Sequence, residues 1–374
     1  MANRIGLLLP RSTDYPAMGY DILDGLKSSL TRAGKRSIEI LSENIGFGEN
    51  TNINYSKAEK LFLQDNVDLV IAYCNSTNAE ALYQLPVVFN KPMIILDAGM
   101  QLPLSPVSSH CFHISLQGVQ ACRFAGYMAG SGNRKVLMAT SFYDGGYRGP
   151  WGYDRGLSEA GGSICGNYVS GYKTAEFTID PYIGLLQHSG AASVAACFSS
   201  YLAELFFKEL KEKKSSAVSL PFYCSPYMAE EQMLAKCDFP GGEFHTVVPW
   251  ASSLKNNYQE EFINTIQSEK NKAANIFHLL GWEAGIVVMQ AGKEGFQSLA
   301  GFSYQSPRGM VMVHPQTHYT YAPMYRGIIE KDENGKCKLT ITGEMPVTPD
   351  EHLKVMSDIG DGIPSGWKNN YLCI

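Results

Sequence analysis

The sequence predicts an α/β protein of two Rossmann-like lobes, each built on a parallel sheet, joined by a multi-stranded hinge. Short apolar runs alternate with amphipathic stretches as far as about residue 249, which is the βαβ rhythm of parallel sheets covered by helices. The alternation passes through two similar cycles. The 374 residues, 45% of them hydrophobic, exceed what one core usually needs, so two domains are expected.

The first cycle fills about the first 120 residues and begins with the apolar strand 5–9, followed by the helix-like stretch 19–32. Its other expected elements are strands 37–41, 67–73 and 93–96 and helices 55–64 and 78–85. This rhythm predicts the first parallel sheet.

The second cycle follows a helix expected at 117–129. Its elements are strands 135–140, 163–169, 193–198, 221–223 and 243–248 and helices 151–160, 180–188, 203–213 and 228–237. They predict a second α/β lobe.

The last third of the chain adds to both lobes. Helix-like segments at 257–268 and 276–292 are expected to return the chain to the first lobe. From Gly309 the pattern alternates like antiparallel strands around a turn at 331–335, which contains an Asn-Gly pair. We therefore assign 1–120 plus about 250–325 to the first lobe and 121–249 plus about 326–374 to the second.

Ligands of open α/β sheets bind at the carboxyl ends of the strands. After the first strand, Ser12, Thr13 and Tyr15 stand in a loop that opens a helix, whose free N–H groups favour anions or carbonyl oxygens. Ordinary N-capping of that helix would also explain these hydroxyls.

Later strands end in similar polar or small residues. The third strand leads into Cys74-Asn-Ser-Thr77, and the fourth ends at Asp97-Ala-Gly99, where small residues would let a ligand approach the backbone or simply make a tight turn. In the second cycle Tyr147 and Tyr201 follow strands. A tyrosine there offers a flat apolar face with a polar tip to a small ligand, or packs on a helix end.

Composition and motifs exclude other classes of function. The net charge of −5 and the lack of a basic patch argue against a nucleic-acid partner, and no apolar run reaches the roughly 20 residues of a membrane span. The sequence has no GxGxxG after the first strand, no P-loop, no GxSxG and no HExxH, so neither catalysis nor a cofactor or metal is expected. An enzyme using Asp97 or Asp144 as a base stays as an alternative without a nucleophile to support it.

The compartment is left open by two observations. Arg4 leads directly into the first strand without an apolar signal segment, so either a signal has been removed or the protein stays inside the cell. The nine cysteines include no CxxC pair and mildly favour a reducing compartment, although some could pair in a secreted form.

Several segments, taken in order, carry a resemblance to a known family. They are Ile5-Gly-Leu-Leu-Leu-Pro10, Ala17-Met-Gly19, Gly25, Val70-Ile-Ala-Tyr-Cys-Asn-Ser-Thr77, Tyr147, Gly156-Leu-Ser-Glu-Ala-Gly161, Trp282-Glu-Ala284, Ser306-Pro-Arg-Gly309 and His314-Pro-Gln-Thr-His318. Together they resemble the Leu/Ile/Val-binding branch of the type I periplasmic solute-binding proteins, including its amide- and urea-type relatives. The resemblance covers nearly the whole chain.

The resemblance implies a non-enzymatic protein that closes on a small ligand and delivers it to an ABC permease, in the periplasm or another extracytoplasmic space. A cytosolic amide-type sensor that regulates a partner protein is the alternative. The implied carboxylate-binding positions are Asn75, Ser76, Thr77, Ala98 and Gly99. Those implied to cover the ligand from the second lobe are Tyr147 and Tyr201, and Met18 stands where members often have an aromatic; Ser12, Tyr15 and Ser225 complete the candidate contacts.

Two departures from the family pattern bear on the ligand. Met100 replaces a threonine that would hold an α-carboxylate, and the loop Tyr223-Cys-Ser-Pro-Tyr227 lacks the acid that would pair with an α-ammonium. An unpaired, desolvated ammonium costs several kcal/mol. The expected ligand is therefore an amide, a small carboxylic acid or an aromatic compound rather than an ordinary amino acid.

Overall fold

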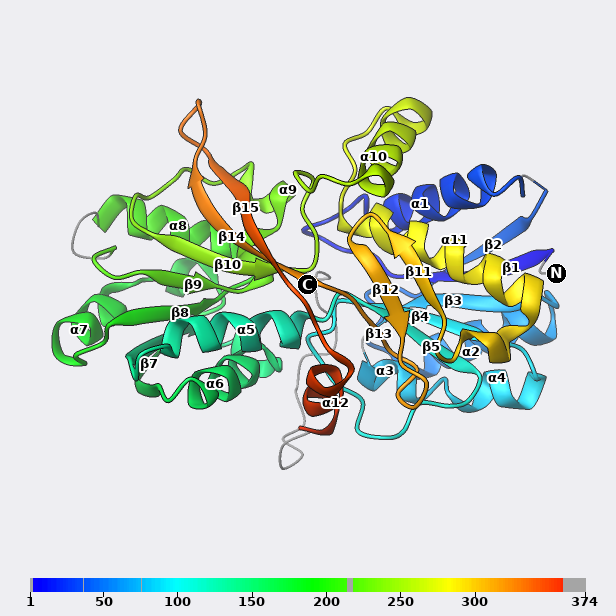
Figure 1. The fold of residues 1–374 in the computed structure, drawn as a ribbon, viewed down its shortest axis with the longest axis horizontal. Helices are drawn as coiled ribbons and strands as arrows, with labels where there is room; N and C mark the ends of the chain where they lie inside the picture. Colours follow the sequence, from blue (N-terminus) through cyan, green and yellow to red (C-terminus); the bar gives the residue numbers. More distant parts are fainter. Residues whose placement is uncertain (1–2, 36, 75, 214–217, 359–374) are drawn as a thin grey trace.

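The computed structural model describes residues 3–358 except 36, 75 and 214–217. Two α/β lobes lie side by side and are joined near the middle of the molecule (Figure 1). The predicted two-lobe α/β architecture with mostly parallel sheets is confirmed. No helix in the described part of the chain is long and apolar enough to cross a bilayer.

The first lobe is a parallel sheet in the order β2-β1-β3-β4-β5, with helices on both faces. Its strands are β1 (Arg4–Leu9), β2 (Glu39–Asn44), β3 (Leu69–Tyr73), β4 (Met93–Asp97) and β5 (Cys111–Ser115). Its helices are α1 (Met18–Arg32), α2 (Thr51–Leu63), α3 (Ser76–Glu80), α4 (Gln84–Phe89), α10 (Asn257–Lys270) and α11 (Ile276–Glu294). Every residue of β3, β4 and β5 is buried, because α1 and α11 cover one face and α2 to α4 the other.

The second lobe contains a seven-stranded sheet in the order β15-β14-β10-β9-β8-β6-β7. Its strands are β6 (Lys135–Ser141), β7 (Ser163–Ser170), β8 (Ser193–Cys197), β9 (Phe222–Cys224), β10 (Phe244–Val248), β14 (Met324–Lys331) and β15 (Cys337–Met345). Its helices are α5 (Gly118–Gly130), α6 (Gly149–Glu159), α7 (Asp180–His188), α8 (Ser200–Lys213) and α9 (Glu231–Leu234). The β10–β14 and β14–β15 pairs are antiparallel, whereas the other neighbours in this sheet are parallel, and the predicted turn between β14 and β15 is confirmed, with Gly335 at φ +82°.

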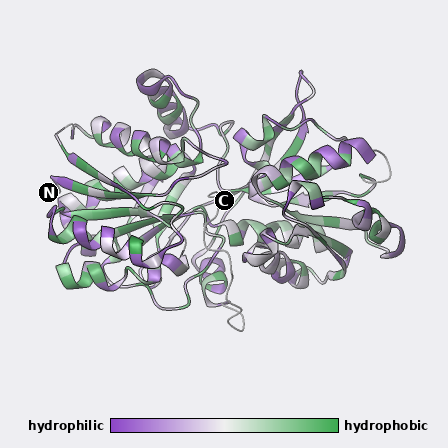
Figure 2. Cartoon of the chain, turned by 180° about the vertical axis from the view of Figure 1, so that it is seen from behind, coloured by the Kyte–Doolittle hydropathy of each residue, from purple (hydrophilic) through white to green (hydrophobic). Residues whose placement is uncertain are grey.

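Hydropathy follows these layers. The strands within both lobes are mainly hydrophobic, whereas the helices carry both kinds of residue (Figure 2). A small antiparallel sheet of β11 (Ser303–Ser306), β12 (Gly309–Val313) and β13 (Thr320–Tyr321) lies beside the first lobe.

Two predicted helices differ in the structure. The stretch 78–85 is divided between α3 and α4, because Pro86 has no N–H for a continuous helix but is tolerated in the first turn of a new one. The stretch 228–237 is mostly irregular: a 3₁₀ turn, Pro226–Ala229, precedes α9, whose N-cap is Glu230. The strand β5 was not predicted.

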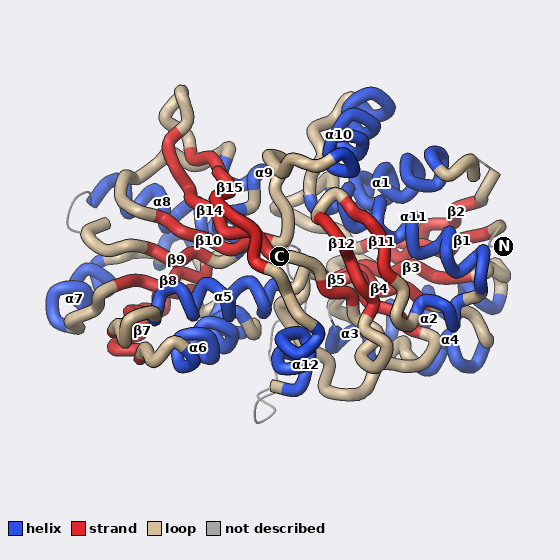
Figure 3. The backbone as a smooth tube through the Cα atoms, viewed as in Figure 1, coloured by secondary structure: helices blue, strands red, loops and turns tan. Residues whose placement is uncertain are grey.

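The hinge consists of three connections: β5 to α5, β10 to α10 and β13 to β14 (Figure 3). The C-terminal helix α12 (Pro349–Ser357) lies beside them and touches both lobes, since His352 stacks on Tyr321 while Lys354 pairs with Glu159 of α6. The assignment of 326–374 to the second lobe stays a prediction, and residues 359–374 lie outside the described part.

A buried ion pair stands at the hinge. The guanidinium of Arg308, in the turn between β11 and β12, donates to both carboxylate oxygens of Glu283 in α11 at 2.7 and 2.9 Å, and both side chains are fully buried. The same guanidinium donates to the carbonyl of Ser115 at the end of β5, while the Tyr325 hydroxyl donates to the Arg308 carbonyl. The pair therefore connects α11 to two of the three hinge connections.

Helices α1 and α11 touch backbone to backbone at glycines. A Cβ on Gly281 would lie 2.0 Å from the Ile22 carbonyl oxygen, and one on Gly25 would lie 2.1 Å from that of His278. No side chain fits at such a distance, so these glycines set how closely the helices approach.

We expect Gly281→Ala to destabilise the protein by about 1–3 kcal/mol, because the added methyl group forces the two helices apart. The matched control is Gly184→Ala in α7, where the new Cβ meets nothing within 4 Å. There the better helix propensity of alanine should increase the free energy of unfolding by at most about 1 kcal/mol. Urea unfolding of both variants measures the difference in stability. Equal unfolding midpoints would contradict the claim that Gly281 is needed for the close approach of α1 and α11.

Candidate functional site

The loop after β1 brings two predicted residues to the boundary between the lobes. The Ser12 hydroxyl accepts a hydrogen bond from the Tyr15 backbone N–H at 3.0 Å, which folds the loop back on itself. Tyr15 is 5% exposed, and its ring packs edge-on against Phe277 of α11. Neither caps the helix: α1 has Ala17 at its N-cap, without a side-chain cap. Met18 follows and is buried in the core.

The loop after β3 shows a different use of its hydroxyl. The Ser76 side chain is buried and donates to the carbonyl of Gln101 at 2.7 Å, so in this conformation its proton is not offered to a ligand. Asn75 lies outside the described residues, as does the side chain of Thr77. The carboxylate-binding role of these residues stays a prediction.

The turn after β4 is held by the hinge. The N–H groups of Gly118 and Val119 donate to the carbonyls of Ala98 and Gly99, and Gly99 adopts φ +67°. A Cβ on Gly99 would lie 2.5 Å from the Ser115 hydroxyl. The tight turn therefore explains the glycine whether or not a ligand approaches it.

Asp97, at the end of the same strand, is engaged within the first lobe. Its carboxylate bonds to the His113 ring at 2.9 Å and accepts from the Ser115 hydroxyl at 2.8 Å. It is 1% exposed, which is poor placement for a catalytic base.

Tyrosines of the two lobes lie close together at the cleft. Tyr147, which is 5% exposed, shares a hydrogen bond of 2.9 Å between its hydroxyl and that of Tyr143. Tyr73, at the end of β3, lies near enough for Tyr147 to act on it: burial, then the charges of Asp97 and Tyr147, raise the pKa of Tyr73. Tyr73 of the first lobe and Tyr147 of the second therefore lie within electrostatic range of each other.

Asp144 organises the loop that carries Tyr147. Its carboxylate accepts from the Ser141 hydroxyl at 2.6 Å and from the Ser199 backbone N–H at 3.2 Å, which ties the loops after β6 and β8 together. Burial raises the pKa of Asp144 to about 6, although the Ser141 and Ser199 hydrogen bonds partly offset this rise.

Two other predicted contacts lie elsewhere. The Tyr201 hydroxyl donates to the Tyr172 carbonyl, and its side chain lines a separate groove of about 640 Å³ beside α8. Ser225 is fully buried and donates to the Phe198 carbonyl at 3.4 Å. The role of Tyr201 and Ser225 in ligand binding stays a prediction.

The structure adds an acid that sequence reasoning missed. Glu230 is 6% exposed and lies beside Tyr15 of the other lobe. Burial raises the pKa of Glu230 to about 7, and hydrogen bonds from the N–H groups of Gln232 and Met233 and from Tyr15 offset only part of the rise. The expected loop does lack an acid, but one stands three residues beyond Tyr227.

Glu230 faces a cavity of about 280 Å³ between the lobes. Its walls are mostly apolar and come from the second lobe, from the connection after β10 and from the segment before α11, and they include Pro226, Ala229, Val248, Pro249, Trp250, Ala273, Ala274 and Ile276. Because both lobes contribute walls, the cavity exists only while the lobes are together.

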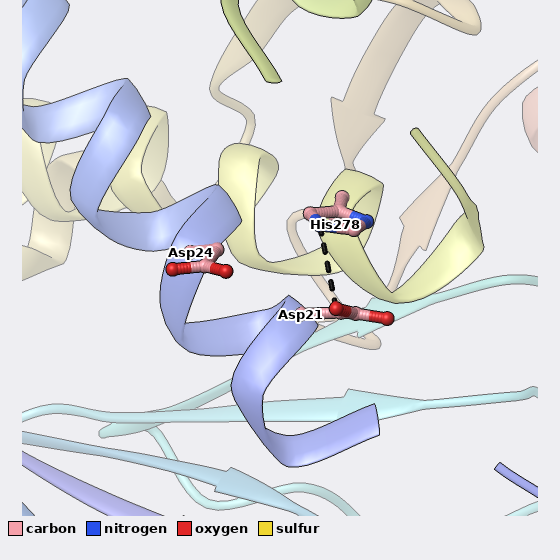
Figure 4. A group of neighbouring side chains, drawn as sticks. All are labelled: Asp21, Asp24 and His278. Atoms are coloured by element: carbon pink, nitrogen blue, oxygen red, sulfur yellow. Dashed lines mark ion pairs between the residues drawn. The ribbon is translucent and has the colours of Figure 1, made fainter. Parts of the chain in front are cut away.

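A cluster near this cavity has the spacing of a metal site. Ligand atoms of Asp21, Asp24 and His278 all lie within 4.8 Å of one another, and the His278 ring faces Asp21 (Figure 4). The ammonium of Lys272 is bound to Asp21 at 2.8 Å and to Asp24 at 2.9 Å, so a lysine holds the position a cation would take. Asn275 also donates to Asp21 at 2.8 Å. We interpret the cluster as an ion-pair network joining α1 to the segment before α11.

Comparison with known proteins places this architecture. The sequence profile of a periplasmic binding protein family matches residues 3–334, whereas no curated protein matches. An ABC transporter substrate-binding protein from Sphaerobacter thermophilus has a TM-score of 0.79 at 20% identity, covering 92% of this chain and 97% of that one. A solute-binding protein from Rhodopseudomonas palustris BisB5, in complex with 3,4-dihydroxybenzoic acid, has a TM-score of 0.75 at 16% identity, covering 94% of this chain and 99% of that one. Another solute-binding protein, from R. palustris and in complex with benzoate, has a TM-score of 0.74 at 20% identity, covering 94% of this chain and 98% of that one.

These identities are low, so the structural matches establish the fold, and the profile establishes the family. The resemblance noted in the sequence is confirmed by both. The chain belongs to the periplasmic binding protein family.

Proposed function

We propose that this protein is the ligand-capturing component of an ABC importer and that it closes its lobes around a small carboxylate- or amide-type molecule, with aromatic acids the first candidates. Structures of the same fold were solved with benzoate, 4-hydroxybenzoate and 3,4-dihydroxybenzoic acid. Those ligands belong to those proteins, and they define the compounds to be tested here.

The observation that carries the proposal is the meeting of aromatic side chains from both lobes at the carboxyl ends of the strands. Tyr73 comes from the first lobe, and Tyr147 with its neighbour Tyr143 from the second. Phenol rings bind a flat aromatic ligand by their faces and a carboxylate by their hydroxyls. A ligand held by both lobes favours the closed arrangement, because only that arrangement makes both sets of contacts.

Binding is tested by thermal shift and calorimetry with benzoate, hydroxybenzoates, leucine and short amides. A ligand at 100 times its dissociation constant adds about 2.7 kcal/mol to stability, so a true ligand gives a clear shift. If leucine gave the largest shift, the ligand class proposed here would be wrong. If no compound shifted the transition, capture of this class of molecule would be excluded.

We expect Tyr147→Ala to weaken binding of the identified ligand about tenfold or more, through loss of an aromatic contact and a hydroxyl. The matched control is Tyr127→Ala, in α5 of the same lobe, whose ring is 50% exposed. Calorimetry on both variants gives the comparison. Equal affinities would remove Tyr147 from the site.

Delivery to a permease is the second part of the proposal, and it places the protein outside the cytoplasm. Reconstituted with its cognate permease, the protein is expected to stimulate ATP hydrolysis only when the ligand is present. Stimulation that ignores the ligand would contradict ligand-gated delivery.

A further inference from the structure

Two cysteines of the second lobe lie opposite each other on neighbouring chain segments. Asp238 and Lys336 form an antiparallel bridge, and one step outward Cys237 and Cys337 are linked by a hydrogen bond of 2.9 Å from the Cys337 N–H to the Cys237 carbonyl. We propose that Cys237 and Cys337 form a disulfide bond when the protein folds in an oxidising compartment.

The backbone register supports the geometry of such a bond. Cys237 and Cys337 make one of the two backbone hydrogen bonds of an antiparallel pair, since the Cys237 N–H donates to the Leu234 carbonyl instead. Residues directly opposite in a hydrogen-bonded antiparallel pair have Cα atoms about 5.5 Å apart and side chains on the same face. Disulfides need about 4.4–6.8 Å between Cα atoms. Both cysteines belong to the same apolar core cluster, and each is 4% exposed.

The Cys337 thiol also lies near enough to affect the Cys237 thiol. Burial and then the neighbouring Cys337 raise the pKa of Cys237 to about 12. In the present reduced state the Cys237 sulfur lies 3.3 Å from the Met233 sulfur. Bond formation therefore requires the Cys237 sulfur to leave its contact with Met233.

The reaction is a thiol–disulfide exchange with an external disulfide, either a small one such as oxidised glutathione or that of an oxidoreductase. One cysteine thiolate attacks the external disulfide and releases one thiol. The second thiolate then attacks the mixed disulfide and releases the other thiol. The protein loses two protons and two electrons, and the external disulfide gains them.

Burial determines when this exchange takes place. It raises the pKa of both Cys237 and Cys337 to about 12, so thiolate is scarce in the folded protein. We expect the bond to form while the chain folds and to resist reduction afterwards.

The bond would join the segment after α9 to the β14–β15 hairpin. That segment follows directly on Glu230 and the wall of the interlobe cavity. Closing a loop of about 100 residues restricts the unfolded chain strongly. The expected gain is an increase in Tm of about 5 °C or more.

The test refolds the full chain in a glutathione redox buffer, blocks remaining thiols and maps disulfide-linked peptides by mass spectrometry. We expect a Cys237–Cys337 peptide that disappears in Cys237→Ser and in Cys337→Ser. The matched control is Cys224→Ser, a buried cysteine of the neighbouring strand β9, which should keep the bond.

Two results would overturn the proposal: all thiols remaining free, or a bond joining another pair such as Cys224 to Cys337. An unchanged Tm after reduction of the correct bond would contradict the expected stabilisation. If the serine variants fail to fold, peptide mapping of the unaltered chain still decides. Ligand binding is measured separately on oxidised and reduced protein. Absence of the disulfide therefore would not contradict the proposed function, and absence of ligand binding would not contradict the disulfide.

Discussion

Ligand affinity is expected to fall as the pH rises, by up to about tenfold per pH unit within a window set by Glu230. In the arrangement of the lobes described here, burial raises the pKa of Glu230 from 4.5 to about 7. Opening removes one wall of its cavity and lets water return, so the pKa of the open form falls back towards 4.5. A group whose pKa rises on closure favours closure fully at pH values below its pKa in the open form. This contribution to closure is lost as the pH rises through its pKa in the closed form.

Calorimetry at pH values from about 5.5 to 8, where a carboxylic ligand stays ionised, measures this dependence. Glu230→Gln is the matched control, because an amide keeps the shape and removes the titration. The groups that face Glu230 are Tyr15 and Glu231, and both remain in that variant. Asp144, whose pKa is raised to about 6, also remains and would account for any residual slope. An unchanged slope in Glu230→Gln would refute the role given to this acid.

Glu283→Ala is expected to destabilise the protein by about 3–5 kcal/mol, because it leaves the guanidinium of Arg308 buried without a counter-charge. Arg308 would keep only its bond to the Ser115 carbonyl at 3.0 Å and the contacts of its aliphatic part. The damage should reach the hinge, since this arginine connects α11 to the ends of β5 and β14. Urea unfolding measures the loss.

A surface pair provides the comparison for that experiment. Arg4 and Glu39 lie 2.8 Å apart, with side chains 40% and 53% exposed, and Glu39→Ala should cost less than about 1 kcal/mol. If both glutamate variants lost the same stability, the buried pair would have no special role.

Most of the fold was predictable because it depends on local periodicity. Strands such as β3 and β4 are buried on both faces and appear in the sequence as continuous apolar runs. The helices between strands appear as amphipathic stretches. The α3–α4 break and the short α9 were harder, because a proline and a single capping glutamate decided them within helix-like sequence.

The site was predictable only in part, because strand ends are visible in sequence but side-chain directions are not. Tyr15 lies beside Glu230 of the other lobe, and the ligand-binding role of Tyr15 and Tyr147 stays a prediction. Ser76 donates instead to a neighbouring carbonyl, and Tyr201 turns towards a separate groove. Glu230 was missed because its partner, Tyr15, stands more than two hundred residues earlier in the chain, and only the assembled lobes bring them together.

The three crossings of the hinge also determine the order in which this protein is completed during synthesis. The last strand of the first sheet ends at Ser115, but α11, which covers one face of that sheet, begins only at Ile276. At ribosomal rates of about 5–20 residues per second, that apolar face waits on the order of ten seconds for its cover. The second lobe emerges during this interval, and until α11 arrives only α1 covers that face of the first sheet.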